Sequence, residues 1–346
     1  MSEYAITQVR HGSPLLSQVD ALLSQEGLTR DRNLDHICAM VDEEGQVIAT
    51  GSAFGQTLRC FAVSREHQGG GLLNEIVSHL MEQQIQRGNS HLFLYTKVKS
   101  AKLFQSLGFY EIARVDGVLS FQENHRKGFA NYLDALAKTA REGLSGAVVM
   151  NANPFTLGHR YLVETAAAQC DTLHLFVLSE DASLVPFSVR KRLVEEGVGD
   201  IPNVVIHDSG PYIISNATFP SYFLKDDLAV MENHAKLDLA VFAAIARALG
   251  VTVRFVGEEP ASQVTNCYNQ VMAQQLPQAG IACRIIPRKT QNGCPISAST
   301  VRQALRDGDW DGLSALVPPT TLAYFQSPEA APCLEALRRA DNVIHH

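Results

Sequence analysis

One stretch, residues 146–165, constrains the fold more than any other part of the chain. It begins with a short apolar run, Ala147 to Met150, which is long enough for a buried parallel strand. From Tyr161 onward the apolar residues have helical spacing. The Asn, Pro and Gly residues in between favour a turn and let the backbone approach a ligand closely. A strand that feeds a helix through such a loop directs backbone N–H groups and the positive end of the helix dipole to one point, which predicts a phosphate site.

The start of this predicted helix carries a four-residue signature, Thr156-Leu-Gly-His159. It resembles the (T/H)xGH motif of the nucleotidylyltransferase superfamily, whose members form adenylates from ATP and release pyrophosphate. The alternative is an ordinary strand, turn and helix with an incidental histidine. The resemblance implies that the loop and helix start bind ATP through Asn153, Pro154, Phe155, Thr156, Gly158 and His159.

A second signature, Ile296-Ser-Ala-Ser-Thr-Val-Arg302, follows a predicted strand over 281–286 and opens another helix. Hydroxyl groups at a helix start cap the backbone and can donate to phosphate oxygens, and an arginine adds fixed positive charge. The run resembles the superfamily's ISSTxxR motif, with an alanine where some relatives have serine and one residue fewer before the arginine. An incidental capping motif is the alternative. The resemblance implies that the β- and γ-phosphates are held by Ser297, Ser299, Thr300 and Arg302, while His159 holds the α- and β-phosphates as a cation or as an N–H donor.

Strands and helices alternate through the second part of the chain. Predicted strands at 172–178, 204–207 and 251–257 lie at crossover spacing, so we expect a doubly wound parallel sheet with the nucleotide at the carboxyl ends of its strands. The run Gly257-Glu258-Glu259-Pro260 resembles the Gly-x-Asp that relatives place beside the ribose or adenine, with either Glu258 or Glu259 as the acid. Lys225 is either a phosphate contact or a surface charge.

The first part of the chain predicts a different mixed α/β domain. A hairpin over 37–51 precedes a glycine-rich turn and a long helix, and the last strand is expected at 109–115. This order resembles a GNAT-type N-acyltransferase. The turn matches that family's (Q/R)xxGx(G/A) motif except at Leu73, and the resemblance implies that a coenzyme A-like arm is bound by Gln68, Gly69, Gly70 and Gly71. A glycine turn without a ligand is the alternative.

Phe104 departs from the GNAT pattern in an informative way. The family usually has a tyrosine there, which protonates the leaving thiolate. A phenyl ring donates no proton. We therefore expect this domain to bind a pantetheine arm rather than to transfer acetyl groups to amines.

Length and composition narrow the class of protein. With 346 residues we expect a GNAT-like domain at 1–125, a helical connector at 126–145 and an ATP-binding catalytic domain at 146–346. No apolar run approaches the ~18–20 residues of a membrane helix. The start Met1-Ser-Glu-Tyr lacks the basic and then apolar pattern of a signal peptide, so we expect none. The 7 cysteines form no CxxC pair, so we expect reduced thiols in a cytoplasmic protein and no metal site. The net charge of −7 argues against nucleic acid as a partner.

The expected fold class is α/β, a GNAT-like mixed domain followed by a doubly wound Rossmann-like nucleotidylyltransferase domain. This combination resembles the citrate lyase ligase family over essentially the whole chain. The resemblance implies that acetate and ATP, with Mg²⁺ on the phosphates, give acetyl adenylate and pyrophosphate. It also implies that the acetyl group passes to the thiol of the phosphoribosyl-dephospho-CoA group on the acyl-carrier subunit of citrate lyase. Two alternatives remain: a mononucleotide or pantetheine-phosphate adenylyltransferase with an accessory domain, and a non-catalytic nucleotide or acyl-CoA sensor.

Overall fold

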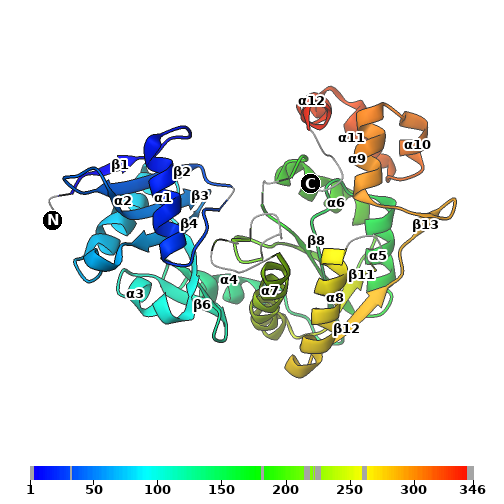
Figure 1. Cartoon of the computed structure of the whole chain (residues 1–346). Coiled ribbons are helices and arrows are strands. Elements are labelled where there is room, and N and C mark those ends of the chain that lie inside the picture. The colour runs from blue at the N-terminus through cyan, green and yellow to red at the C-terminus, as the bar shows by residue number, and fades with distance from the viewer. Residues whose placement is uncertain are drawn as a thin grey trace. The chain divides into compact units, whose positions relative to one another are not determined.

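The chain forms two compact units in a computed structural model (Figure 1). One unit comprises Met1–Asn131 and Phe219–Ala240, and the other comprises Tyr132–Thr218 and Val241–His346. The boundaries expected from the sequence stay a prediction. The structure describes residues 4–31, 33–180, 183–213, 219, 220, 222, 227–258 and 263–340.

A mainly antiparallel sheet of seven strands forms the centre of the N-terminal unit, in the order β1-β2-β3-β4-β5-β7-β6 (Figure 1). The β4–β5 pair is parallel and the other neighbours are antiparallel. The strands are β1 (Ile6–Gln8), β2 (His36–Val41), β3 (Val47–Phe54), β4 (Thr57–Val63), β5 (Phe93–Lys97), β6 (Tyr110–Val115) and β7 (Leu119–Glu123).

Helices of this unit pack on the sheet through the apolar faces that the sequence predicts. The face of α2 buries Leu72, Ile76 and Leu80 against Cys38 and Met40 of β2. The helices between residues 1 and 137 are α1 (Pro14–Gln25), α2 (Leu72–Gln86), α3 (Ala101–Gln105) and α4 (Gly128–Ala137), with 3-10 turns η1 (Arg65–His67) and η2 (Val98–Ser100).

The expectation that the last strand of this unit lies at 109–115 is wrong. β7 follows it and lies between β5 and β6, so β6 forms the edge of the sheet. All residues of β7 are buried. A strand buried on both faces needs no regular alternation of apolar and polar residues, which is why this one is hard to recognise.

The C-terminal unit contains a five-stranded parallel sheet in the order β10-β9-β8-β11-β12. The chain runs from β8 outward to β10, and then returns to continue from β11 to β12 on the other side. This is the doubly wound arrangement expected from the sequence, so the α/β fold class is confirmed. The strands are β8 (Ser145–Met150), β9 (Thr172–Val177), β10 (Val204–Asp208), β11 (Val251–Gly257) and β12 (Ala282–Ile286).

A hydrophobic core of this unit joins the sheet to several of its helices. Val148 of β8 and Leu175 of β9 pack against Val163 of α5, Leu193 of α6 and Val301 of α9. The helices that lie wholly or partly in this unit are α5 (Leu157–Ala167), α6 (Phe187–Val198), α7 (Asp227–Leu249), α8 (Gln263–Gln275), α9 (Ala298–Asp307), α10 (Trp310–Ser314), α11 (Pro319–Gln326) and α12 (Ala331–Arg339), with η3 (Leu276–Ala279) and η4 (Pro328–Ala330).

A short hairpin links the last strand of the sheet to α9. It pairs β13 (Thr290–Gln291) with β14 (Cys294–Pro295) through Asn292 and Gly293. Both loop residues have positive φ, 51° and 79°, as a two-residue turn of type I′ requires. The hairpin delivers the chain to the start of α9 with a fixed direction.

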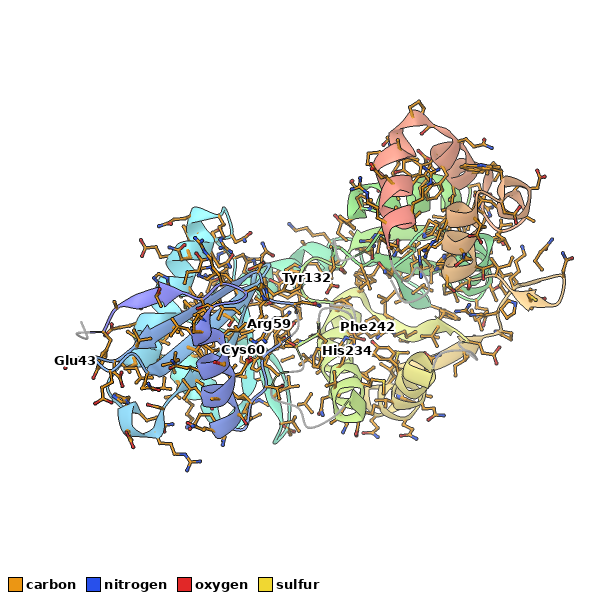
Figure 2. The ribbon with its side chains drawn as sticks, turned by 45° about the horizontal axis from the view of Figure 1, so that its top comes forward. Glu43, Arg59, Cys60, Tyr132, His234 and Phe242 are labelled. Atoms are coloured by element: carbon orange, nitrogen blue, oxygen red, sulfur yellow. The ribbon has the colours of Figure 1, made fainter. Side chains whose placement is uncertain are left out.

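Aromatic and polar groups lie among the apolar residues elsewhere in this unit. The Arg254 guanidinium of β11 stacks over the Phe242 ring of α7, 4.2 Å from its centroid (Figure 2). His174 of β9 and His207 of β10 are stacked, with Nδ1 of the first 2.9 Å from Nε2 of the second. Burial lowers the pKa of each to about 4, so both rings are neutral at pH 7.

These two histidines predict a loss of stability in acid. In the unfolded chain they take up protons as the pH falls through 6.5, whereas in the folded chain they do so only near 4. Stability is therefore complete above pH 6.5 and declines between pH 6.5 and 4, by about 2 kcal/mol per ring at pH 5. Urea unfolding at pH 7 and pH 5 measures this decline. His174→Phe/His207→Phe should flatten it, and an equally steep decline in that variant would contradict the assignment.

Candidate active site

A hollow opens at the carboxyl ends of β8, β11 and β12. It lies at the switch point between β8 and β11, where the order in which the strands are added to the sheet changes direction. Ligands bind at such a switch point in doubly wound sheets. The hollow is open to solvent, and the space inside it that a water molecule can reach is about 80 Å³. It is lined by Thr156, Gly158, His159, Tyr161, Leu162, Gly257, Ile286, Pro287, Arg288, Lys289, Ile296, Ser297 and Ala298.

Thr156 and His159 close the start of α5 as a reciprocal cap. The Thr156 hydroxyl accepts from the His159 backbone N–H at 3.2 Å, and His159 Nδ1 accepts from the Thr156 backbone N–H at 3.1 Å. Histidine thus takes the place that glutamate or glutamine has in the usual capping box. The signature therefore fixes the ring as well as the helix start.

The cap also sets the protonation of His159. Since Nδ1 accepts a backbone hydrogen bond, the neutral ring carries its proton on Nε2. Burial, followed by the nearby positive charges of Arg288 and Arg302, lowers the pKa of His159 to about 4. At neutral pH the side chain is an N–H donor without charge. Of the two states expected from the sequence, the structure favours the neutral donor.

Gly158 brings the two signatures together. A Cβ at this position would lie 2.8 Å from the carbonyl oxygen of Ile296, which immediately precedes the second helix start. Only glycine leaves room for this approach. The starts of α5 and α9 therefore border one hollow, as the two motifs predict.

Ser297 caps α9 and organises the other hydroxyls of its motif. Its oxygen accepts from the Thr300 backbone N–H at 3.1 Å and lies 2.8 Å from Ser299 Oγ and 2.7 Å from Thr300 Oγ1. Ser297 lines the hollow. Ser299 and Thr300, which were also expected to bind phosphate, contact Ser297 but are not among the residues that line the hollow.

Two buried arginines hold the loop that precedes α5. Arg302 is 4% exposed and donates from Nη1 to the Asn153 carbonyl at 2.6 Å. Arg190 of α6 is fully buried and donates to the Asn151 carbonyl at 2.8 Å and to the Leu178 carbonyl at 2.8 Å. In this structure Arg302 therefore positions the loop, and its expected contact with phosphate stays a prediction.

The three residues before Thr156 are buried next to the hollow and do not line it. Asn153 is 2% exposed and accepts from the Val185 backbone N–H at 3.0 Å. Phe155 is fully buried, and its ring lies so close to Gly197 that a side chain there would clash with it. The Phe155 ring is also nearly parallel to the His159 ring, with centroids 5.9 Å apart. Pro154 is buried beside them. None of the three is among the residues that line the hollow.

Two basic residues that the sequence analysis did not select line the hollow. Arg288 donates from Nε to the Glu258 carbonyl at 2.7 Å, and burial lowers its pKa. Lys289 Nζ lies 6.0 Å from the centroid of the Tyr161 ring. Their only signal in the sequence is a pair of basic residues directly after a strand, at the edge where the other strands also end.

The remaining predicted residues divide into three groups. Gly257 lines the hollow and its carbonyl accepts from Asn269 Nδ2 at 3.1 Å, while Glu258 is exposed next to it. The residues Gln68, Gly69, Gly70 and Gly71 are exposed in the N-terminal unit, ahead of α2. Lys225 lies outside the described residues.

Across the described ranges, no group of three or more His, Cys, Asp or Glu side chains is close enough to hold a metal ion. No helix in the described part of the chain is both long and apolar enough to cross a membrane.

Comparison with known proteins gives consistent matches. The model of the citrate lyase ligase C-terminal domain family matches residues 145–325. A citrate (pro-3S)-lyase ligase of Klebsiella pneumoniae is 40% identical over 92% of this chain and 94% of its own. One from Escherichia coli is 39% identical over 90% of each chain. A phosphopantetheine adenylyltransferase of Staphylococcus carnosus is 39% identical over 57 residues, 16% of this chain and 35% of its own.

Solved structures match the N-terminal part. A GNAT family N-acetyltransferase of Escherichia coli in complex with CoA is 16% identical, with 36% of this chain and 83% of that chain covered and a TM-score of 0.27. A GNAT family acetyltransferase of Staphylococcus aureus is 10% identical, with 34% and 98% covered and a TM-score of 0.30.

Replacement of Gly158 by valine tests the close approach of the two helix starts. The side chain would meet the Ile296 carbonyl, so we expect the free energy of unfolding to fall by about 1–3 kcal/mol. Gly257→Ala is the matched control, because a Cβ there meets Leu162 only at 3.9 Å and should cost much less. Urea denaturation measures both. Equal stability of Gly158→Val and the unmodified chain would contradict this packing.

Proposed function

Because this chain belongs to the citrate lyase ligase family, we propose that it activates acetate with ATP and passes the acetyl group to a thiol on citrate lyase. Family membership makes the chain an enzyme, a ligase with a role in the activation of citrate lyase. The finer steps proposed are formation of acetyl adenylate and pyrophosphate, followed by acetylation of the phosphoribosyl-dephospho-CoA group on the acyl-carrier subunit.

The observation that carries the adenylation step is the convergence of two helix starts on one hollow. The starts of α5 and α9 both direct their N-terminal backbone toward it, and Thr156, His159 and Ser297 line it. Helix N-termini favour anionic groups through their N–H donors and their dipoles. Arg288 and Lys289 add positive charge on the third side. Such a surface suits a triphosphate.

The proposed reaction needs no protein nucleophile. An acetate oxygen attacks the α-phosphorus of ATP in line, a P–O bond to acetate forms, and the bond to pyrophosphate breaks. Catalysis then consists of positioning and of stabilising the negative charge that develops on the phosphates. His159 would donate from Nε2 to a phosphate oxygen near the α-phosphorus, while Ser297, Arg288 and Lys289 would hold the leaving pyrophosphate.

Magnesium fits this site as a companion of the nucleotide. No carboxylate is among the described residues that line the hollow, and Mg²⁺ prefers oxygen ligands and keeps several waters. The ion would therefore be held mainly by phosphate oxygens, with the Thr156 and Ser297 hydroxyls within the same hollow. It would neutralise charge on the phosphates.

The N-terminal unit is proposed to receive the thiol arm of the acceptor. The exposed glycine turn ahead of α2 has Gly69 and Gly71 at positive φ, 87° and 83°. Phe104 is buried against Phe61, with ring centroids 5.3 Å apart, and it supplies no proton. This supports binding of an arm rather than amine acetylation.

His159→Ala tests the proposed charge stabilisation. The loss of one donor to a developing charge typically slows a reaction ~10²–10³-fold. We expect such a decline in acetate-dependent exchange of pyrophosphate into ATP, together with a modest loss of thermal stability, because the Thr156 backbone N–H loses its acceptor. His11→Ala is the control, since this exposed histidine lies in the other unit. Exchange at the original rate in His159→Ala would remove His159 from the mechanism.

The same assay separates the alternatives. An adenylyltransferase would incorporate AMP into a stable product and show no requirement for acetate. A sensor would show no exchange at all.

Lys289→Met tests the basic side of the hollow. Removal of one charged hydrogen bond to the triphosphate should raise the KM for ATP about tenfold, and less at high salt. Arg284→Met is the matched control, because this exposed residue on β12 bonds to Gln169 at 2.7 Å and does not line the hollow. Steady-state kinetics with varied ATP measure both. Equal values of KM in the two variants would exclude Lys289 from ATP binding.

A further inference from the structure

Strands β4 and β5 of the N-terminal unit diverge soon after they meet. Their parallel pairing joins Thr57 to Phe93 and Leu58 to Leu94. Beyond that, β4 continues beside β3 and β5 continues beside β7. The backbone groups that face the resulting gap therefore have no opposite strand among the described ones. Such groups need hydrogen-bond partners when they are buried.

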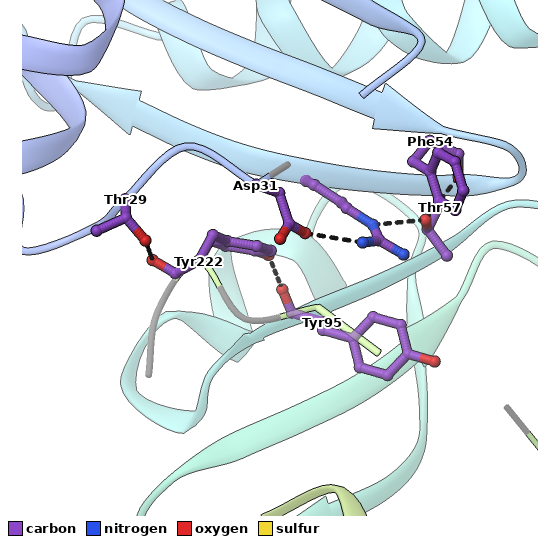
Figure 3. Close-up of polar contacts among 7 residues, drawn as sticks. Thr29, Asp31, Phe54, Thr57, Tyr95 and Tyr222 are labelled. Atoms are coloured by element: carbon purple, nitrogen blue, oxygen red, sulfur yellow. Dashed lines mark hydrogen bonds and ion pairs between the residues drawn. The ribbon is translucent and has the colours of Figure 1, made fainter. Parts of the chain in front are cut away.

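A tyrosine from a distant part of the sequence fills this gap (Figure 3). Tyr222 is 5% exposed, and its hydroxyl donates to the backbone carbonyl of Tyr95 in β5. The backbone of Cys60 in β4 also acts on this hydroxyl, because it lowers the pKa of Tyr222 against the larger, opposite effect of burial. The phenol thus lies between the two strands at the level where their ladder is broken.

A distortion of β4 makes this bridge possible. Thr50 pairs with Ala62 and Ser52 pairs with Arg59, so two residues of β4 lie opposite one residue of β3. Cys60, in this bulge, has a φ of 55°. A bulge turns a backbone group out of the ladder, and here the Cys60 backbone turns toward the phenol.

Further contacts anchor the tyrosine on both sides. The Thr29 backbone N–H donates to the Tyr222 carbonyl at 2.8 Å. Phe219 packs edge-on against the Tyr95 ring, with centroids 5.9 Å apart. Arg59, beside Cys60 on β4 (Figure 2), is held by Asp31 at 2.7 Å. This is a built contact within one compact unit, since residues 219–240 belong to it.

The groups that Tyr222 satisfies are those that an extended amide chain would use. A chain with N–H and C=O groups at intervals can add to the edge of a strand through main-chain hydrogen bonds. The pantetheine arm of coenzyme A is such a chain, with two secondary amides and a terminal thiol. It would need the Tyr95 carbonyl and the Cys60 backbone as partners.

We propose that Tyr222 is a specificity-determining residue that occupies the place of the thiol arm between β4 and β5, so that an arm enters only when Tyr222 leaves. The proposal rests on the proposed thiol-transfer function. Free coenzyme A gains no contacts from a carrier protein, and the need to displace Tyr222 weakens its binding. A carrier-borne arm has additional binding energy to displace it.

Binding of coenzyme A to the full chain tests this by calorimetry. If Tyr222 competes with the arm, the apparent Kd is raised by the small fraction of open protein, so Tyr222→Ala should bind at least about tenfold more tightly. Tyr324→Ala, which removes an equally buried tyrosine of the other unit, should bind as the unmodified chain does. The nucleotide part of coenzyme A without its arm should bind both alike. The proposal would be overturned if coenzyme A bound equally to the unmodified chain and to Tyr222→Ala, or bound detectably to neither. It would also be overturned if Tyr222→Ala bound the nucleotide without the arm more tightly by the same factor as coenzyme A.

A second measurement applies if Tyr222→Ala does not fold. In the unmodified chain, saturating coenzyme A should accelerate hydrogen exchange at the Thr29 amide, whose acceptor is the Tyr222 carbonyl. Unchanged exchange would overturn the proposal. Acetate-dependent exchange of pyrophosphate into ATP, measured on the same samples, reports the proposed adenylation separately. Its absence would reject that step without bearing on the competition at the gap.

Discussion

The loop between β8 and α5 is held by buried charge, and the geometry of the hollow depends on it. The carbonyls of Asn151 and Asn153 accept from the guanidinium groups of Arg190 and Arg302. A buried guanidinium is stable only when its donors are bonded, and these carbonyls provide acceptors for the two arginines. Arg190 comes from α6 and Arg302 from α9. The loop, both helices and the cap at Thr156 are therefore fixed as one body.

Local sequence signals predicted most of what surrounds the hollow. Apolar runs predicted the parallel strands, and the motif at Thr156 predicted the start of a helix. That Thr156 and His159 cap this helix reciprocally is a finding of the structure. The contact between the two motifs follows from the strand order, because parallel strands end at one edge. Gly158 was expected to allow close approach, and the Ile296 carbonyl is the group that approaches it.

Long-range contacts were the part that could not be predicted. Arg302 was predicted to bind phosphate. Whether its side chain faces a ligand or a backbone carbonyl depends on Asn153, which lies 149 positions earlier in the sequence. Lys289 has no motif around it. Tyr222 reaches Tyr95 across 127 positions, and no periodicity records such a contact. In both units, then, side chains from distant parts of the sequence bond to backbone carbonyls at the ends or edges of strands.

The structure of the chain with bound ATP tests the central claim most directly, because it locates the triphosphate without reference to activity. The account predicts phosphate oxygens between the starts of α5 and α9, with His159 Nε2 within hydrogen-bond distance of one of them and Lys289 near the terminal phosphates. A triphosphate bound elsewhere, with His159 and Ser297 contacting only protein, would contradict it.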